Sequence, residues 1–235
     1  MKILLSGGSG LLGRELLKLD SDIISPTHSE MDVYNKESID EYINKTKPDV
    51  FLHCAAFTSP PKIDADPAKA IKDNIIGTSN VALSCMKESV RLVYISTDYV
   101  FRGDRGQYSE EDEVYPQNKY AWSKLGGECA VRLYDNSLII RTSFIADIFP
   151  YEKAFVDQYT SRDAVSVIAP IILELTKRTN LCGVFHVGTE RKTVFELAKR
   201  LRPDVGEMHR KDVSFAVPAD TSFDLNKLKS SSGVS

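Results

Sequence analysis

The sequence of 235 residues predicts an α/β protein with a doubly wound parallel sheet. Short runs that are apolar throughout alternate along the chain with longer runs whose apolar residues recur at helical spacing. The short runs have no polar face, which is typical of strands that are buried on both sides beneath covering helices. A parallel sheet with helices on its two faces satisfies both observations.

The alternation can be followed run by run. The predicted strands lie at residues 3–5, 23–24, 50–52, 92–95 and 138–140. The helices predicted between them lie at residues 11–19, 36–45, 67–88 and 118–133. Pro67 suits a first helical turn, because the N–H that proline lacks would have no partner there.

After Arg141 the alternation weakens. Helical spacing returns at residues 165–178 and 194–201, and residues 184–187 predict one more strand. We therefore predict two domains, a sheet domain at residues 1–142 and a small C-terminal lobe at residues 143–235 that is built partly on the first.

Charge and cysteine content argue against several classes of function. Lys and Arg number 30 and Asp and Glu number 33, so the net charge of −3 gives no basic field for nucleic acid. No apolar stretch approaches the roughly 20 residues of a membrane span, and the glycines after Leu5 leave no room for a secretory signal. The cysteines lie far apart, at Cys54, Cys85, Cys129 and Cys182. We expect a cytoplasmic protein with no metal, no membrane and no nucleic-acid partner.

A glycine-rich turn directly follows the first predicted strand. Gly7, Gly10 and Gly13 form a GxxGxxG pattern between that strand and a helix. Gly7 allows the tight turn, Gly10 lets backbone N–H groups approach a pyrophosphate, and Gly13 allows the helix to pack closely on the sheet. The alternative is a glycine turn without a ligand. The strand–turn–helix context favours a Rossmann-type dinucleotide site, with the positive helix end directed at the phosphates.

Two further features carry chemistry. Ser96 and Thr97 end the strand predicted at 92–95, where open α/β sheets place their ligands, although a threonine there can simply satisfy its own backbone. Tyr120 and Lys124 lie four residues apart on a predicted helix and therefore share one face. A neighbouring ammonium lowers the pKa of a phenol from about 10, which makes it a better acid–base catalyst near neutral pH.

A second tyrosine and lysine have the same spacing. Tyr115 and Lys119 are also four residues apart, but Pro116 disfavours helical backbone at the residue before it. Tyr115 is therefore predicted to lie in a loop, and Tyr120 with Lys124 is predicted to be the functional pair.

Longer strings around these residues resemble the extended short-chain dehydrogenase/reductase family, and within it the dTDP-4-dehydrorhamnose reductases. The most specific string is Ser-Thr-Asp-Tyr-Val-Phe at residues 96–101. The other similar strings lie at residues 53–58, 74–78, 120–128, 141–143, 157–161 and 224–228. The resemblance spans nearly the whole chain.

The resemblance implies NADPH-dependent reduction of a 4-keto-6-deoxy nucleotide sugar, of the type that converts dTDP-4-dehydrorhamnose to dTDP-L-rhamnose. Tyr120 would protonate the oxygen that forms at C4 of the sugar, and Thr97 would polarise the carbonyl. Lys124 would bind the nicotinamide ribose and lower the pKa of Tyr120. The C-terminal lobe would bind the nucleotide-diphosphate sugar, and a homodimer would be compatible with the family.

The resemblance also implies further site residues. Besides the three glycines, Tyr120 and Lys124, the implied cofactor-binding residues are Ser9, Leu11, Leu12, Arg14, His28, Asp32, Val33, Ala55, Ala56, Thr58, Asn74 and Ser96. The implied substrate-binding residues are Thr97, Asp98, Tyr99, Val100, Arg141, Ser143 and Phe144. Arg141 is equally compatible with a role in packing.

The choice of dinucleotide depends on the end of the second predicted strand. An acidic residue about 20 positions after the glycines would bind the ribose 2′-OH and favour NAD. Neutral and basic residues occupy positions 25–28, whereas Glu30 and Asp32 come later in the chain. Residues 25–28, together with Arg14, suit a 2′-phosphate, so NADPH is predicted, with NADH as the alternative. His28 is equally compatible with a plain surface position.

Two other functions stay open. An epimerase or dehydratase of the same family would use the same tyrosine and lysine. A non-catalytic NADP-binding regulatory subunit, similar to the β subunit of methionine adenosyltransferase, would act through a partner enzyme. The chain is shorter than the family between Phe149 and Asp157, which favours this alternative, but the presence of Thr97, Tyr120 and Lys124 together favours an enzyme.

Overall fold

The structure is a computed structural model, and it describes residues 1–232. The chain divides into two compact units, and neither is continuous in sequence. The first unit consists of Met1–Ser96, Asn118–Ile140 and Ala169–Val184. The second consists of Thr97–Gln117, Arg141–Ile168 and the chain from Phe185 onward. The division at residue 142 between a cofactor domain and a substrate lobe stays a prediction.

A five-stranded sheet confirms the predicted fold class. Its strands are β1 (Ile3–Ser6), β2 (Val50–His53), β3 (Arg91–Thr97), β4 (Ser137–Thr142) and β9 (Gly183–Val187). They are ordered β1-β2-β3-β4-β9, and β2 runs parallel to both β1 and β3. The strand predicted at 23–24 is shorter than expected, because Ile24 alone bridges to Leu4 beside β1.

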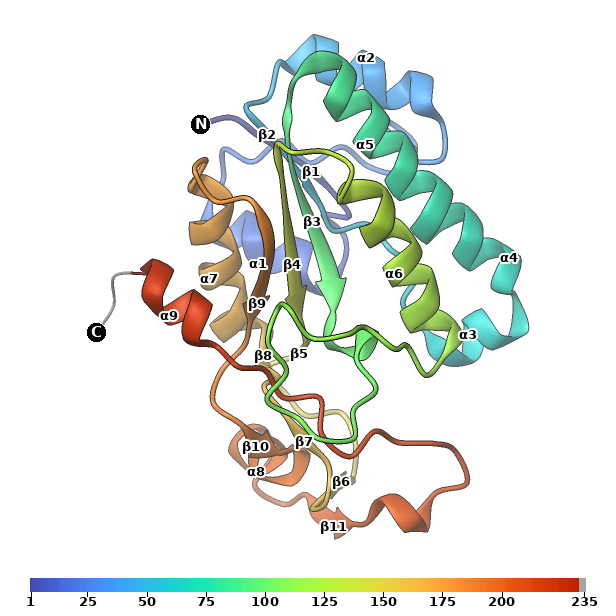
Figure 1. Ribbon diagram of the computed structural model, residues 1–235, viewed down its shortest axis with the longest axis vertical. Helices are drawn as coiled ribbons and strands as arrows, with labels where there is room; N and C mark the ends of the chain where they lie inside the picture. Colours follow the sequence, from blue (N-terminus) through green and yellow to red (C-terminus); the bar gives the residue numbers. More distant parts are fainter. Residues whose placement is uncertain (233–235) are drawn as a thin grey trace. The chain divides into compact units, whose positions relative to one another are not determined.

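Helices cover the two faces of the sheet. In Figure 1, α1 (Leu11–Leu19) and α7 (Val165–Lys177) lie on one face, and α2 (Lys36–Thr46), α5 (Gly77–Glu88) and α6 (Lys119–Val131) lie on the other. The side chains of Asn35 and Asn118 accept backbone N–H groups in the first turns of α2 and α6, which explains why these helices begin there. The predicted helices at 11–19, 36–45 and 118–133 are therefore confirmed to within two residues.

The helix predicted at 67–88 is confirmed in its bounds, but it contains a π-helical segment. After α3 (Pro60–Ala65), the helical residues run without a gap through α4 (Pro67–Ala70), the π-helical segment η1 (Ile71–Ile76) and α5. Asp66 ends α3 and caps α4 through the N–H of Lys69 at 3.0 Å, and Pro67 fits the first turn as predicted. Apolar periodicity cannot distinguish the wider turn of η1 from an α-helix, so the π-helical segment was not predicted.

The core of the first unit lies between the sheet and the helices α2 and α5. Leu4, Phe51 and Leu92 from neighbouring strands are fully buried there, and Ile39 of α2 and Val81 of α5 pack in the same cluster. The apolar strands are thus covered on this side by the apolar faces of α2 and α5, as the alternation of apolar and amphipathic runs in the sequence predicted.

The second unit contains short β elements. Its paired strands are β5 (Phe144–Ile145) with β8 (Asp163–Ala164), β6 (Lys153–Phe155) with β11 (Gly206–Met208), and β7 (Tyr159–Thr160) with β10 (Lys192–Thr193). The helices are α8 (Val194–Leu201) and α9 (Asn226–Ser232), and the 3₁₀ turns are η2 (Asp98–Val100) and η3 (Arg210–Asp212). A separate core contains Phe149, Ala154, Val194 and Ala198. The helix predicted at 194–201 is confirmed, whereas α9 was not predicted.

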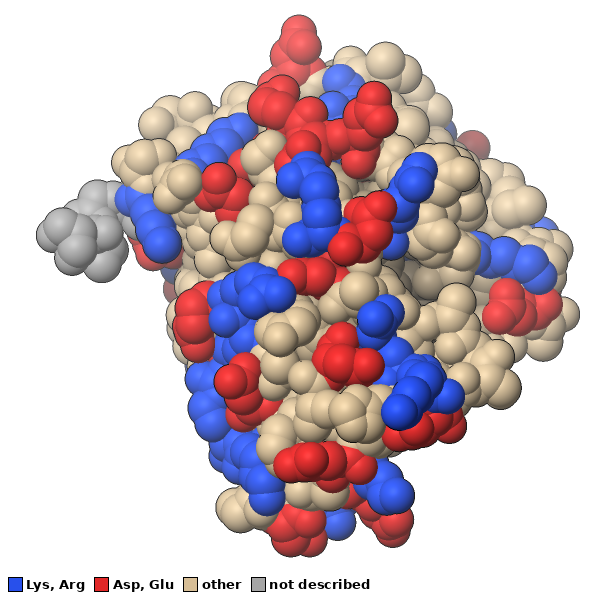
Figure 2. Space-filling view, turned by 60° about the horizontal axis from the view of Figure 1, so that its bottom comes forward, with Lys and Arg blue, Asp and Glu red and all other residues tan. Residues whose placement is uncertain are grey.

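The surface carries charges of both signs. On the face shown in Figure 2, lysine and arginine side chains are interspersed with aspartate and glutamate side chains. Within residues 1–232, every helix is too short or too polar to cross a lipid bilayer.

Candidate active site

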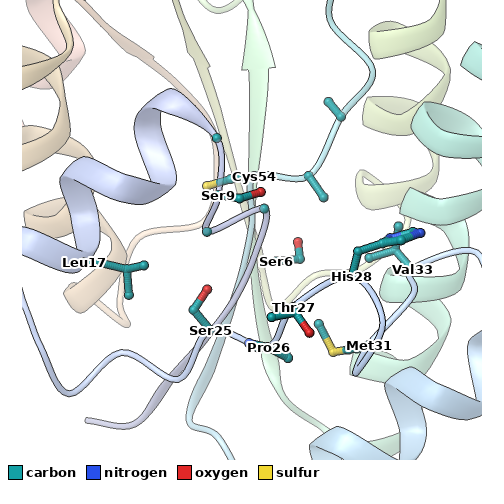
Figure 3. Close-up of a pocket in the computed structure, with 15 residues that line it drawn as sticks. Ser6, Ser9, Leu17, Ser25, Pro26, Thr27, His28, Met31, Val33 and Cys54 are labelled. Carbon is teal, nitrogen blue, oxygen red and sulfur yellow. The ribbon is translucent and has the colours of Figure 1, made fainter.

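A cavity of about 540 Å³ opens in the first unit where β1 and β2 end. Figure 3 shows the residues around it, with Leu17 at one end of the group and His28 and Val33 at the other. The residues that line it are Ser6, Gly7, Gly8, Ser9, Gly10, Leu17, Ser25, Pro26, Thr27, His28, Met31, Val33, Cys54, Ala55 and Ala56. The cavity therefore lies at the carboxyl ends of the strands, where open α/β sheets bind ligands.

The glycine turn is packed too tightly for side chains. Gly7 has φ +84°, and a Cβ there would lie 2.6 Å from the backbone nitrogen of Ala55. A Cβ at Gly13 would lie 2.3 Å from the carbonyl oxygen of Gly7. Gly10 is the N-cap of α1, and no side chain caps the helix or places an acid in its first turn. The N–H groups at this positive end thus suit the phosphates of a dinucleotide.

The other implied residues of this turn have different surroundings. Leu12 is buried in the core, and Leu11 is half-buried beside it. Arg14 is exposed and lies outside the lining of the cavity, and its Nη1 donates to the carbonyl oxygen of Ser9 at 2.5 Å. The guanidinium therefore braces the glycine turn, and any direct contact between Arg14 and a cofactor stays a prediction.

Asn74 connects the loop after β2 to helix α6. Its Oδ1 accepts the N–H of Phe57 at 2.7 Å, and its Nδ2 donates to the Phe57 carbonyl at 2.9 Å and to Ser123 Oγ at 2.8 Å. Ser123 in turn donates to the Tyr120 carbonyl at 2.7 Å. Asn74 is fully buried, and its amide binds both backbone groups of Phe57, the residue that directly follows Ala55 and Ala56 of the cavity wall. Thr58, the next residue after Phe57, is exposed and outside the lining.

Tyr120 and Lys124 lie one turn apart on α6, as predicted. Tyr120 is half-buried, and Lys124 is buried with its Nζ 4.2 Å from the centre of the Tyr94 ring. Burial lowers the pKa of Lys124 from 10.5 to about 7, against the opposing effects of Cys54 and Glu128. Tyr115 lies in a loop before the helix and is exposed, so the predicted distinction between the two pairs is confirmed at the level of secondary structure.

Ser96 is turned to a different partner. Its hydroxyl donates to Glu128 Oε2 at 2.8 Å, and the carboxylate of Glu128 is fully buried. Arg132 binds the other oxygen of Glu128, with Nη2 at 3.1 Å from Oε1. The implied contact of Ser96 with a cofactor therefore stays a prediction, as does that of Asp32, which is half-buried and lies outside the cavity lining.

A polar cluster in the second unit contains the predicted substrate residues. The Thr97 hydroxyl donates to Asp98 Oδ1 at 3.1 Å and accepts the N–H of Tyr99 at 3.2 Å. Asp98 Oδ2 accepts from the Thr221 hydroxyl at 2.8 Å. Burial raises the pKa of Asp98, and the charge of Arg162 opposes that rise.

Other predicted substrate residues lie around this cluster. Ser143 Oγ accepts from Nε of Arg162 at 2.8 Å, and the guanidinium of the buried Arg141 lies over the Phe101 ring at 5.1 Å. Phe144 is half-buried in β5, and Val100 is buried. All predicted substrate residues therefore fall in the second unit, and all predicted cofactor residues fall in the first.

The sequence did not reveal several of these residues. Arg162 and Thr221 were missed in the second unit, although Arg162 directly follows the family-like string at 157–161. In the first unit, Met31 and Cys54 line the cavity without having been named, whereas Ser25 and Thr27 belong to the stretch at 25–28 that was predicted to suit a 2′-phosphate. Ser25 directly follows Ile24, and Cys54 directly follows β2. Their positions just after the ends of strands could have identified them as cavity residues.

The fold, the glycine turn and the tyrosine–lysine pair define a Rossmann-type oxidoreductase. A family model described as the RmlD substrate binding domain matches residues 1–167. The dTDP-4-dehydrorhamnose reductase of Aggregatibacter actinomycetemcomitans is 30% identical over 207 residues, which are 84% of this chain and 70% of that protein. The chain belongs to the RmlD substrate-binding domain family, among the extended short-chain dehydrogenases/reductases.

Two further relatives bear on function. The crystal structure of dTDP-4-dehydrorhamnose reductase from Bacillus anthracis in complex with NADP has a TM-score of 0.88 and 28% identity, and the match covers 100% of this chain and 93% of that one. Methionine adenosyltransferase 2 subunit beta of Rattus norvegicus is 27% identical over 233 residues, covering 84% of this chain and 70% of that protein. The matches to two other curated reductases span 52% and 50% of their lengths.

Proposed function

We propose that this protein reduces the 4-keto group of a 4-keto-6-deoxy nucleotide sugar with NADPH, in the manner of dTDP-4-dehydrorhamnose reductase. The observation that carries the proposal is the pair of Tyr120 and buried Lys124 on α6, in the same unit as a cavity walled by the glycine turn. The family relationship supports the substrate class, because the matched relatives include reductases of dTDP-4-keto sugars.

The cavity suits a nicotinamide dinucleotide. The uncapped start of α1 and the tightly packed glycines leave room for a pyrophosphate beside the backbone. The relative from Bacillus anthracis was crystallised with NADP, which supports NADPH as the reductant, and NADH stays the alternative. When bound, the reduced nicotinamide supplies a hydride to the carbonyl carbon.

The residues of this chain would supply the proton and the orientation. Tyr120 gives its phenolic proton to the oxygen that forms at C4, and Lys124 favours the resulting phenolate by its charge. The anionic phosphates of a bound dinucleotide would raise the pKa of Lys124 from about 7 and hold it as an ammonium. The Thr97 hydroxyl has one proton, which forms a hydrogen bond to Asp98 in the structure. To donate a hydrogen bond to the substrate carbonyl, the hydroxyl has to break its bond to Asp98.

The remaining assignments follow from these roles. We assign residues 1–142 mainly to NADP(H) binding and residues 143–235 mainly to binding of the nucleotide sugar. The candidate contacts of the sugar are Ser143 and, from the end of the first range, Asp98, Tyr99 and Arg141. Asn74 would act by holding the wall of the cavity in place. A cytoplasmic location fits free cysteines, and a homodimer stays a prediction.

A turnover assay tests the proposal. The purified protein is mixed with NADPH and dTDP-4-keto-6-deoxy-L-mannose, and the absorbance of the reduced nicotinamide is followed. We expect the absorbance to fall only when both compounds are present. Firm binding of NADPH without oxidation by any 4-keto nucleotide sugar would contradict an enzymatic role.

A second candidate is a non-catalytic, NADP-binding regulatory subunit. The match to methionine adenosyltransferase 2 subunit beta over 84% of the chain favours it. Thr97, Tyr120 and Lys124 are all present, which a binding role alone does not require. The same assay separates the candidates from each other, and trials with UDP- and GDP-sugars separate both from an epimerase or dehydratase.

A further inference from the structure

The carboxylate of Glu30 folds back onto Thr27, a residue that lines the cavity. Glu30 Oε2 accepts the backbone N–H of Thr27 at 2.7 Å and the Thr27 hydroxyl at 2.8 Å. The sequence placed Glu30 too far along the chain to affect the cofactor. In the structure, however, the turn that follows Thr27 brings the acid back to a residue of the cavity wall.

Thr27 lies where a Rossmann-type fold holds the adenosine ribose. Ile24 pairs with Leu4 beside β1, so residues 25–28 leave the carboxyl end of that edge of the sheet. In dinucleotide-binding folds, the group that contacts the ribose 2′ position follows the glycines by about 20 residues, and Thr27 stands at that distance from Gly7. Ser25, beside it, packs its hydroxyl against the glycine turn, 1.9 Å from where a Cβ of Gly8 would be.

The bond to Glu30 decides what Thr27 can offer a ligand. The Thr27 N–H and hydroxyl hold the pKa of Glu30 below its usual value, so the carboxylate is ionised at neutral pH and has no proton to give. The single hydroxyl proton of Thr27 is then directed to Glu30, and Ser29 Oγ, 3.0 Å from the same oxygen, donates to one of its lone pairs, so one lone pair is left for a ligand. A ribose 2′-OH can donate to such an oxygen, whereas a 2′-phosphate needs donors and positive charge.

Positive charge at this end of the cavity is scarce. Among the residues that line it, none is Lys or Arg, and His28 is charged only when protonated, with Nδ1 3.8 Å from Asp32 Oδ1. Lys45 and Tyr42 of α2 also act on Glu30 and lower its pKa further. The charged group in direct contact with Thr27 is the carboxylate of Glu30, and the ammonium of Lys45 offsets part of that negative charge.

We propose that Glu30 is a positioning residue that sets the choice between NADPH and NADH. Its carboxylate accepts the hydrogen bond of the Thr27 hydroxyl and places a negative charge behind the ribose 2′ position. It therefore weakens the binding of NADPH relative to that of NADH, so that the chain can use both dinucleotides. This inference rests on the proposed function, since it concerns the dinucleotide of that same site.

The substitution Glu30→Gln tests it. Gln keeps one oxygen that can accept both the N–H and the hydroxyl of Thr27, as Oε2 of Glu30 does, and it removes the negative charge. We expect the ratio of the dissociation constants for NADH and NADPH to rise about tenfold, the size of a single nearby charge in a partly hydrated site. Glu41→Gln, which removes an exposed charge from α2, is the matched control and should leave the ratio unchanged.

The constants are measured by calorimetric titration of each variant with each dinucleotide at one ionic strength. Thr27→Val is the second variant, and it should lower the affinity for NADH more than that for NADPH because it removes the acceptor. An unchanged ratio in Glu30→Gln, or an equal loss of both affinities, would overturn the inference. Glu30 would then only stabilise the turn through its hydrogen bonds to Thr27. A wild-type protein that bound neither dinucleotide would instead refute the proposed function, and the inference with it.

Discussion

At the scale of single residues, Lys124 has the most unusual environment in the candidate site. It is 3% exposed, and burial brings its pKa down to about 7. An ammonium held in such a place destabilises the fold, because the unfolded chain keeps the ordinary pKa of 10.5. The residue is therefore better explained by its chemistry than by stability.

Lys124→Met should make the free protein more stable in acid. The unfolded state binds the additional proton between pH 7 and about 10.5, so the penalty of wild-type Lys124 is complete below pH 7 and fades as the pH rises. We expect the variant to exceed the wild type at pH 6 by up to about 5 kcal/mol, and by much less at pH 9. Urea unfolding of both proteins at pH 6, 7.5 and 9 measures the difference, and a difference that did not change with pH would contradict the account.

At the residue level, a backbone conformation could be predicted from the sequence, whereas the hydrogen-bond partner of a side chain could not. The loop position of Tyr115 could be predicted, because proline restricts the residue before it whatever the tertiary structure. The role of Glu30 could not, since its position in the chain says nothing of the turn that returns its carboxylate to Thr27. The pairing of Ser96 with Glu128 was hidden for the same reason.

At the scale of elements, the π-helical segment η1 connects the cavity wall to α6, the helix that carries the proposed catalytic pair. Asn74 lies within η1, fully buried, and binds Phe57 on one side and Ser123 of α6 on the other. Periodicity predicted one continuous helix at 67–88, and the chain is helical throughout this range, but the π-helical segment was not predicted because the apolar residues keep helical spacing through it.

Asn74→Ala should cost about 1–3 kcal/mol for each buried group that loses its partner, and it should weaken NADPH binding. The affinity falls because Ala55 and Ala56 are no longer held through Phe57. Asn44→Ala removes an exposed amide of α2 and, as the control, should change stability by less than about 0.5 kcal/mol. Urea unfolding and NADPH titration measure both effects; an Asn74→Ala protein that bound NADPH like the wild type would refute the positioning role.

At the scale of the whole molecule, the sequence predicted the large sheet better than the small elements. Strands such as Leu92–Ile95 are apolar on both faces and long enough to be read from composition. The paired strands of the second unit are two or three residues long, too short for any periodicity, so they could not be foreseen. The division of the predicted site residues between the two units also emerged only from the structure.

The most direct test of the account is hydride transfer by Tyr120→Phe compared with Tyr115→Phe. Each variant is given NADPH and a dTDP-4-keto-6-deoxy sugar, the oxidation of NADPH is followed, and its binding is measured separately. Loss of the phenolic proton donor should lower the rate at least about 100-fold in Tyr120→Phe, with little change in NADPH affinity, whereas Tyr115→Phe should behave like the wild type. Full activity in Tyr120→Phe, or its loss in Tyr115→Phe alone, would contradict the assignment of the catalytic pair.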